Sequence, residues 1–298
     1  MSTVARRGPA LGLAALVLLA GCATPTSGPT TPAEPPTTAT TAEEPSEEPS
    51  TDTPTPTEEP TVTEDRTAVY FVADTRAGFR LVREPHALTG DRAVAALETM
   101  IAGPADPDYA TAWNPDTQVR SVTEADGVWL VDLSADARTA NVGSEGAALM
   151  IQQLVWTVTE AVGDPAAAVL LTIDGEPAGE LWGALVVTEP VVREDPLGVR
   201  VLVQIDNVAE GDTVTSPLTV TGEAAVFEAT LLWRVLDATG AEVANGMTMT
   251  TEGQTFAPYS FEVTLEPGTW TVVVEESDPS GGEEGGPVMT DSRTVTVG

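Results

Sequence analysis

The 298-residue chain contains no lysine, a single cysteine and a single histidine, His86. All thirteen basic residues are therefore arginines, and they stand against 46 acidic residues, which gives a formal net charge of −33. So acidic a chain is a poor partner for nucleic acid or anionic lipid, since both are themselves negatively charged. One cysteine excludes a disulfide within the chain, and one histidine excludes a metal site that needs two imidazole ligands. We attribute the acidity to solubility or salt adaptation rather than to a specific basic partner.

A short apolar run near the N-terminus has the pattern of an export signal. Arg6-Arg7 precede the run, which extends from Ala10 to Ala20 and is too short to span a bilayer. It ends in Leu19-Ala20-Gly21-Cys22, which resembles the lipobox of bacterial lipoproteins. The resemblance implies cleavage between Gly21 and Cys22, with a diacylglyceryl group on the cysteine sulfur. Two acyl chains, at about 0.8 kcal/mol per buried CH₂, are enough for stable anchoring.

Residues 1–21 are therefore expected to be a lipoprotein signal peptide. The mature protein is expected to be held by lipid on the extracytoplasmic face of the cell membrane. The alternative is an ordinary signal peptide that leaves Cys22 as an unused thiol. General secretion is the expected route, because Gly8-Pro9 stand where a twin-arginine signal usually has large apolar residues.

Residues 22–65 have the composition of a disordered linker. Thr, Pro, Glu and Ser dominate from Ala23 to Asp65, with ten carboxylates and no basic residue. Such a segment cannot bury enough apolar surface to offset the entropy of ordering it. The sequence therefore predicts a stalk between the membrane and the folded part, with Thr/Pro density that also permits O-glycosylation.

The remaining residues are long enough for two domains, and the first, residues 66–190, has the pattern of an α+β fold. The expected order is strand, helix, two strands, helix, strand, with the helices packed on one face of a small mixed sheet. The two central strands flank Asp126-Gly127, a strong hairpin signal. The expected elements are Thr67–Ala73, Gly90–Ala102, Gln118–Glu124, Val128–Leu133, Glu145–Val162 and Val169–Ile173.

Several pieces of this first domain, in order and spacing, resemble the GerMN domain, also called the sporulation and spore germination domain. They are Ala95-Ala96-Leu97 to Gly103-Pro104, Asn114-Pro115-Asp116-Thr117, Gly127 to Ser134, Ile151 to Trp156, and Ile173-Asp174-Gly175. The resemblance implies an extracytoplasmic module with no established catalytic residues. Its fold is similar to the ring-building motifs of secretion machines, which makes homo-oligomerisation a further hypothesis.

The second domain, residues 199–298, shows only short strands separated by turn signals, the pattern of a β-sandwich. Seven strands are expected, near Arg200–Asp206, Leu218–Gly222, Phe227–Leu236, Glu242–Thr250, Tyr259–Leu265, Thr269–Glu275 and Met289–Val297. Trp233 stands on the third strand, where immunoglobulin-like domains commonly bury a tryptophan. Val214 to Ala224 and Phe227-Glu228-Ala229 resemble the immunoglobulin-like domain found beside GerMN in spore germination proteins. The proline-containing link Glu189 to Leu197 predicts that the two domains unfold separately.

A search for catalytic or metal-binding groups yields only weak candidates. Ser144 lies in Gly143-Ser144-Glu145-Gly146, which is more typical of a helix start than of a nucleophile. Two groups of acidic residues are weak candidates for Ca²⁺ sites, and one acidic pair is a weak candidate for a glycosidase site. Neither group has EF-hand spacing, and solvated carboxylates are the simpler interpretation of all of them. These are Asp106, Asp108 and Asp116; Asp278, Glu283 and Glu284; and the pair Glu98 and Asp132. We expect no enzyme activity, no cofactor and no metal.

The expected function is therefore binding, with another envelope protein as the partner besides the lipid attached at Cys22. A first alternative is a binder of peptidoglycan or another wall polymer, through Phe79, Tyr109 and Trp113, whose rings could stack on sugars. Core or turn packing is the competing interpretation of all three aromatic residues. A wall hydrolase is the second alternative and has the least support.

The lipobox makes a direct prediction about location. Cys22→Ser should move the protein from the membrane fraction to the medium, or leave it as uncleaved precursor, because the acyl acceptor is lost. Cell fractionation and detergent partitioning measure this. Recovery of the variant as a mature, detergent-phase protein would contradict the assignment of Cys22.

Overall fold

The computed structural model describes residues 66–277 and 288–298. The signal peptide, Cys22, the linker and the acidic residues Asp278, Glu283 and Glu284 lie outside the described residues. Among the described residues, no helix is both long and apolar enough to cross a membrane.

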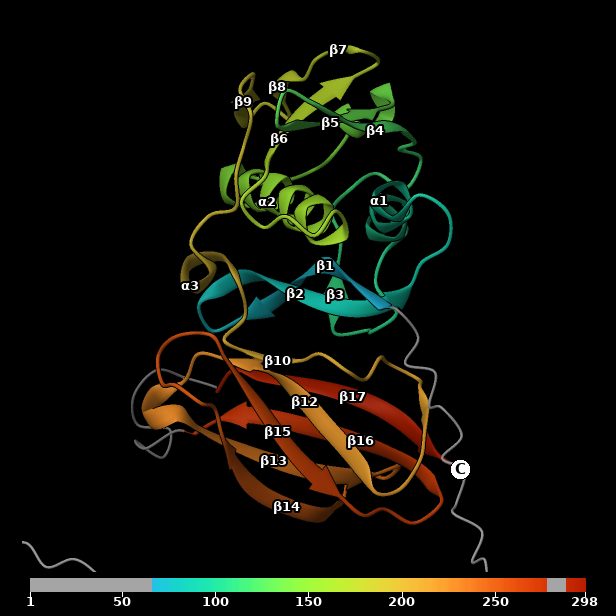
Figure 1. Cartoon of the computed structure of the whole chain (residues 1–298), viewed down its shortest axis with the longest axis vertical. Coiled ribbons are helices and arrows are strands. Elements are labelled where there is room, and N and C mark those ends of the chain that lie inside the picture. The colour runs from blue at the N-terminus through green and yellow to red at the C-terminus, as the bar shows by residue number, and fades with distance from the viewer. Residues whose placement is uncertain (1–65, 278–287) are drawn as a thin grey trace, which may run out of the picture. The chain divides into compact units, whose positions relative to one another are not determined.

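The first domain contains two helices between two sheets (Figure 1). One sheet has the strand order β2-β1-β3 and the other β4-β5-β6-β7, and β8 and β9 form a short ribbon. The predicted arrangement, with both helices on one face of a single sheet, is therefore wrong. The elements are β1 (Arg66–Thr75), β2 (Gly78–Ala87), α1 (Arg92–Ala102), β3 (Tyr109–Ala110), β4 (Val119–Ala125), β5 (Val128–Leu133), a 3₁₀ turn (Ala135–Arg138), α2 (Ser144–Ala161), β6 (Ala168–Ile173), β7 (Glu176–Pro177), β8 (Gly179–Leu181), β9 (Leu185–Val187) and α3 (Pro196–Val199).

Most of the predicted elements of this domain are confirmed. Helix α1 begins after Asp91, whose carboxylate accepts hydrogen bonds from the Ala93 and Val94 amides at 3.1 and 3.0 Å. The β4–β5 hairpin turns at Asp126-Gly127, where both residues have positive φ, as a type I′ turn requires. Strands β5 and β6 are parallel, so the four-stranded sheet is mixed, as expected.

Helix α2 is buried on nearly all sides because it lies between the sheets. Its buried polar residues also form hydrogen bonds within the fold. Gln153 donates to the Tyr70 carbonyl of β1 at 2.9 Å, and Thr157 accepts from the Tyr70 amide at 3.2 Å. The helix therefore satisfies backbone groups of the neighbouring strand as well as burying apolar surface.

Strand β2 was not predicted. It pairs with β1 over ten residues, from Arg66↔Ala87 to Thr75↔Gly78, and Gly78 completes the turn with a φ of +87°. The segment carries Arg80, Arg83, Glu84, Pro85 and His86 and has little apolar alternation, so its sequence resembles a loop. This hairpin, together with Asp106 and Tyr109, contacts the second domain.

The second domain is a β-sandwich, and all seven predicted strands are confirmed. Its sheets have the orders β10-β12-β15 and β11-β17-β16-β13-β14, and the short strand β11 is an addition to the prediction. The 3₁₀ turn Phe227–Ala229 precedes the third predicted strand. The strands are β10 (Val203–Ile205), β11 (Thr213–Val214), β12 (Leu218–Ala224), β13 (Thr230–Asp237), β14 (Glu242–Met249), β15 (Ala257–Val263), β16 (Gly268–Glu276) and β17 (Thr290–Val297).

Trp233 is only half-buried, so it is not the fully buried core tryptophan that its position suggested. Its ring stacks on Phe261 with centroids 4.8 Å apart and an interplanar angle of 3°. It also covers Gly246, where an added Cβ would lie 2.3 Å from the tryptophan Cζ2. The centre of the core is instead aliphatic, with Leu231 and Val235 fully buried on the same strand.

The hydrophobic clusters of the two domains remain distinct among the described residues. Two clusters belong to the first domain and extend to Val199 and Val201, and the third contains only residues from Val203 onward. The link between the domains is nevertheless packed against the first. Val191 forms a β-bridge with Val169, and Arg193 lies over the ring of Trp156 at 4.3 Å. The link therefore does not act as a free spacer.

Candidate functional site

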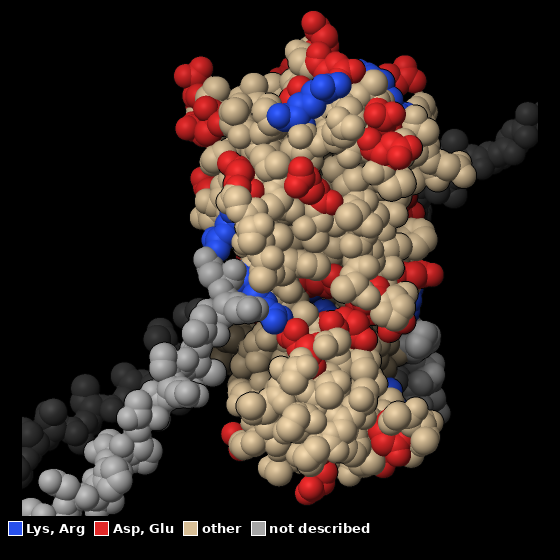
Figure 2. Space-filling model, turned by 90° about the vertical axis from the view of Figure 1, so that its right-hand side faces the viewer, with Lys and Arg blue, Asp and Glu red and all other residues tan. Residues whose placement is uncertain are grey.

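The junction between the two domains is built by arginines of the β1–β2 hairpin. Arg66 pairs with Asp212 at 2.7 Å, and Arg76 pairs with Glu276. Arg83 reaches Asp206 at 2.7 Å. All three carboxylates belong to the sandwich, so the hairpin supplies the positive charge and the sandwich the negative charge. On the face shown in Figure 2, several basic side chains lie among acidic ones where the domains meet.

Glu223 of the sandwich links two of these arginines. Its carboxylate lies 3.0 Å from Arg83 and 3.1 Å from Arg200, which follows the link between the domains. Burial raises the pKa of the Glu223 carboxyl, but the two guanidinium groups outweigh burial and leave the pKa below its ordinary value. Glu223 is thus held ionised by arginines from both sides of the junction.

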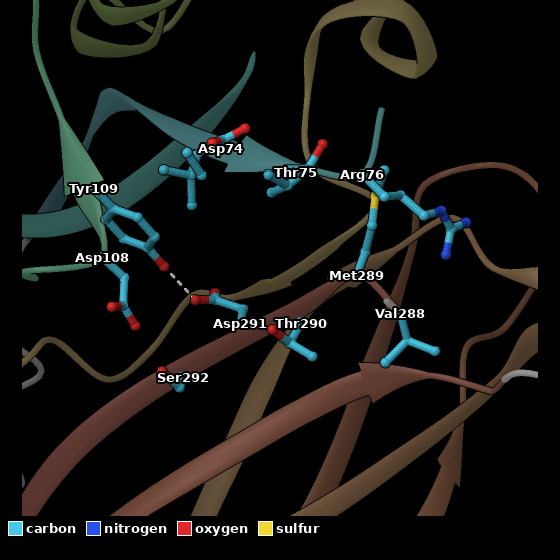
Figure 3. A pocket seen from close by; sticks show the side chains of 13 residues that line it. Asp74, Thr75, Arg76, Asp108, Tyr109, Val288, Met289, Thr290, Asp291 and Ser292 are labelled. Carbon is cyan, nitrogen blue, oxygen red and sulfur yellow. Dashed lines mark hydrogen bonds between the residues drawn. The ribbon is translucent and has the colours of Figure 1, made fainter. Parts of the chain in front are cut away.

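Arg293 of β17 extends from the sandwich to the first domain and is fully buried. Its Nη1 lies 2.6 Å from the Asp291 carboxylate, 2.6 Å from the Tyr109 hydroxyl and 3.1 Å from the Asp106 carboxylate. Burial raises the pKa of Tyr109 well above its ordinary value, so the phenol keeps its proton and donates it to Asp291 (Figure 3). Asp291 also accepts from the Ile205 amide at 2.6 Å. We call Asp106, Tyr109, Asp291 and Arg293 the junction cluster.

A pocket of about 480 Å³ opens beside the junction cluster. Figure 3 shows the Tyr109 ring directed from β3 toward Asp291 on β17, with Arg76 on the opposite wall. Two of the charged groups that line the pocket are already paired, Arg76 with Glu276 of the other domain and Asp291 with Arg293 of the same strand. The pocket is therefore a gap between docked surfaces, and its strongest polar groups serve the docking.

The carboxylates that the sequence suggested for Ca²⁺ are not brought together. Asp106 is buried and pairs with Arg293, and its other oxygen accepts from the Asp108 amide at 2.9 Å. Asp116 is exposed in a separate turn, where its amide donates to Asn114. Within residues 66–277 and 288–298, no group of three or more His, Cys, Asp or Glu is placed to hold a metal ion.

The other chemical candidates serve the fold. His86 bonds Glu84 at 3.0 Å, and Glu84 in turn accepts from the Ala105 and Asp106 amides. Ser144 is the first residue of α2, as its context predicted. Asp132 accepts from the Thr172 hydroxyl and the Gly175 amide, both at 2.8 Å, which fixes the turn after β6. Glu98, its suggested glycosidase partner, is exposed on α1.

Two of the three aromatic residues suggested for sugar stacking are unavailable. Trp113 is buried edge-on against Trp182, with ring centroids 5.6 Å apart, and Tyr109 belongs to the junction cluster. Phe79 alone is exposed, at 51%, on the rim of a pocket of about 440 Å³ beside the start of α2. The packing interpretation therefore holds for Trp113 and Tyr109.

An exposed apolar surface lies on the outer strands β13 and β14 of the larger sheet. Residues at alternate positions of β14 point away from the core, and Val243, Met247 and Met249 are 49%, 66% and 59% exposed. Leu232 of β13 pairs with Met247 on the same face. Four of the nine large apolar side chains exposed in the described part of the chain lie on this strand pair. We call these four residues the β14 surface.

Two features of the sequence correspond to the junction and to the β14 surface, neither of which the sequence analysis predicts. Arg76, Arg80 and Arg83 are three of the eleven arginines of residues 66–298, clustered in one short segment of a very acidic chain. The stretch from Val243 to Thr251 is free of charge. Neither signal indicates which partner the side chains meet, because that depends on the tertiary structure.

Removal of Arg293 tests how strongly the junction stabilises the fold. Arg293→Met should lower the free energy of unfolding of the full chain by about 3–5 kcal/mol, because Asp106 and Asp291 stay buried without their cation. Urea unfolding measures this. The matched control is Arg120→Met, because Arg120 and Asp174 are about half exposed and the loss should stay within about 1 kcal/mol. Equal losses in both variants would contradict a stabilising junction.

Asp106 makes the stability depend on pH. Burial raises its pKa from 3.8 to about 6, against the opposing effects of the Asp108 amide and Arg293. The folded state therefore binds a proton more readily than the unfolded state, and this contribution is lost as pH rises through 6. Between pH 7 and pH 5, the wild type should gain about 1 kcal/mol of unfolding free energy relative to Asp106→Asn. Urea titrations of both proteins at the two pH values measure this difference, in which contributions from other titrating groups cancel. If the difference between wild type and variant is the same at pH 7 and pH 5, the raised pKa is contradicted.

Comparison with known domain families assigns both folded domains. Residues 68–179 match the model of the domain described as "Sporulation and spore germination". Residues 202–283 match the model described as "Immunoglobulin-like domain of bacterial spore germination". A comparison with curated proteins found no match.

Solved structures of similar proteins include the first GerMN domain of the sporulation protein GerM from Bacillus subtilis, at 21% identity, with 43% of this chain and 97% of that chain covered and a TM-score of 0.35. A putative lipoprotein from Clostridium perfringens is 17% identical, with 45% and 91% covered and a TM-score of 0.32. The tandem GerMN domains of the same Bacillus subtilis protein are 15% identical, with 67% and 61% covered and a TM-score of 0.33. The chain therefore contains a GerMN-type domain followed by an immunoglobulin-like domain of the spore germination type.

Proposed function

We propose that this protein is a lipoprotein, anchored through Cys22 on the extracytoplasmic face of the membrane, that acts by binding other proteins. The observation that carries the proposal is the β14 surface, where apolar side chains are exposed on the outer strand of a sheet. Contiguous apolar surface on a soluble domain usually marks an interaction site. An unpaired strand edge adds backbone donors and acceptors that a partner strand can use.

The position of the β14 surface fits this role. The contacts to the first domain use β10, β12, β16, β17 and the segments beside them, whereas Met247 and Met249 lie on a strand that pairs only with β13 among the described residues. The junction therefore leaves the β14 surface open. A predicted anchor and stalk would hold this surface away from the lipid and let it search a volume for partners.

Non-catalytic action is supported by two independent observations. Both matching family models describe spore germination domains and not enzymes. The polar residues that could have served chemistry, Asp106, Asp132 and His86, are engaged in contacts that hold the fold together. Binding to a wall polymer is the second candidate, but of the three suggested aromatic residues only Phe79 is exposed.

The absence of lysine decides the design of the test, because amine-reactive crosslinkers would find no side chain to modify. A photo-crosslinking amino acid is therefore placed at Met247 in living cells, with Cys22 intact. We expect discrete protein adducts. The matched control is the same group at Val186 of β9, which is 67% exposed against 66% for Met247 but lies in the other domain.

Adducts of equal pattern and yield at the two positions would contradict a specific β14 surface. No adducts at Met247, together with saturable sedimentation on purified cell wall, would instead support the polymer-binding candidate.

A further inference from the structure

The outer edge of β14 has no ladder partner among the described residues, although β15 lies beside its end, where the Thr248 hydroxyl donates to the Ser260 carbonyl at 2.8 Å and the Thr251 amide donates to the Pro258 carbonyl at 3.2 Å. The Thr250 amide donates to the Ala229 carbonyl at 2.9 Å, which makes Thr250 one of the residues whose backbone groups face β13. Because these groups alternate in an antiparallel ladder, the N–H and C=O groups of Val243, Asn245, Met247 and Met249 face away from β13. Among the described residues, β14 pairs with no other strand. The edge therefore offers an unused set of hydrogen-bonding groups.

From Val243 to Thr251 this edge lacks charge and proline, two features that usually prevent strand addition, although a β-bulge opposite Val235-Leu236 interrupts the ladder at the start of β14. Natural edge strands carry charged residues or proline along their length. Elsewhere in the described structure, β15 has Pro258, β2 has Pro85, and β4 has Arg120 and Glu124. From Val243 to Thr251 the chain has neither proline nor charge, although the whole chain is strongly acidic. The exposed backbone edge thus carries neither charge nor proline from Val243 to Met249.

The sequence of β14 is complementary to itself in one antiparallel register. In this register Gly246 lies opposite Gly246 of a second copy. Val243 then lies opposite Met249 of the other copy, and Asn245 lies opposite Met247. By symmetry each of these pairs occurs twice. All these side chains point away from the core, so the outer and inner faces of the sheet continue across the two copies. Cross-strand apolar pairs of this kind stabilise a sheet.

Neighbouring registers that keep the same side chains on each face of the sheet are less favourable. Centring the pairing on Met247 sets Glu242 against Glu252, and like charges directly opposite each other are destabilising. Centring it on Asn245 places Met249 opposite Ala241, which lies outside β14. The register centred on Gly246 instead places Glu242 opposite Thr250, so no charges oppose each other.

On the basis of the proposed function, we infer that the partner of the β14 surface is a second copy of this chain. Two β14 strands pair antiparallel about a two-fold axis at Gly246, and the two five-stranded sheets become one continuous sheet. The interface is isologous, because each copy contributes the same strand. An acidic protein can approach its own copy here, since the contact strand carries no charge from Val243 to Thr251. A predicted membrane anchor would raise the local concentration of copies.

The register is tested with single thiols in the full chain carrying Cys22→Ser. Chains with Asn245→Cys and chains with Met247→Cys, distinguished by tags, are mixed and treated with a thiol crosslinker that spans no more than about 6 Å. Residues directly opposite in a ladder lie about 5.5 Å apart and diagonal ones about 7–8 Å. The mixture should therefore give a dimer, and each variant alone should give much less. A predominant Met247→Cys homodimer, or no dimer above the level of Val186→Cys, would overturn the inference.

A second variant tests the surface without new thiols. Met247→Glu in the full chain should weaken dimerisation about tenfold or more in light scattering, because it buries a carboxylate beside Asn245 of the partner copy. Val186→Glu should leave dimerisation unchanged, and a thermal melt verifies that both variants remain folded. Equal dimerisation of wild type and a folded Met247→Glu variant would overturn the inference.

The photo-crosslinking experiment separates this inference from the proposed function. Adducts of twice the mass of the chain support the second copy. Adducts only to a different protein leave the proposed function standing and overturn the inference, whereas the absence of adducts contradicts both.

Discussion

The structure depends on the ion pairs between the β1–β2 hairpin and the sandwich. Arg66, Arg76 and Arg83 extend from one hairpin to carboxylates of the second domain, and Arg293 returns from β17 to Asp106. Burying such charges costs desolvation energy. This cost is offset only when each arginine meets its carboxylate in good geometry. This condition fixes how the domains meet. It also explains why a chain with 46 acidic residues places several of its few arginines at one junction.

The docked junction determines what is left for function. Asp106, Tyr109 and Asp291 are engaged in contacts between the domains, and the junction occupies the side of the sandwich that carries β10 and β17. Strand β14 lies at the edge of the larger sheet, where apolar side chains stay exposed. The two features are complementary. Strong charge pairing holds the domains together inside the molecule, and an uncharged strand remains for contact outside it.

Helix and strand predictions succeeded where local pattern and tertiary environment agree. The Asp126-Gly127 hairpin, helix α1 behind Asp91 and the seven sandwich strands all have clear periodicity or turn chemistry. Strand β2 was missed because its arginines and Pro85 resemble a loop, and they become strand residues only because β1 pairs with them and the sandwich meets their charges. Trp233 was misjudged for a related reason, since Phe261 and Gly246 hold its ring at the edge of the core.

Composition and residues adjacent in the chain are enough to identify the two domain families, their order and the acidic character of the protein, and they predict an export signal with Cys22. Which arginine meets which carboxylate, and which strand forms the open edge, depends on contacts between residues far apart in the chain. Arg83 and Asp206 are 123 residues apart, and Arg293 and Asp106 are 187 apart. No local pattern encodes such pairings, because they exist only after two separately folded cores have brought the side chains together.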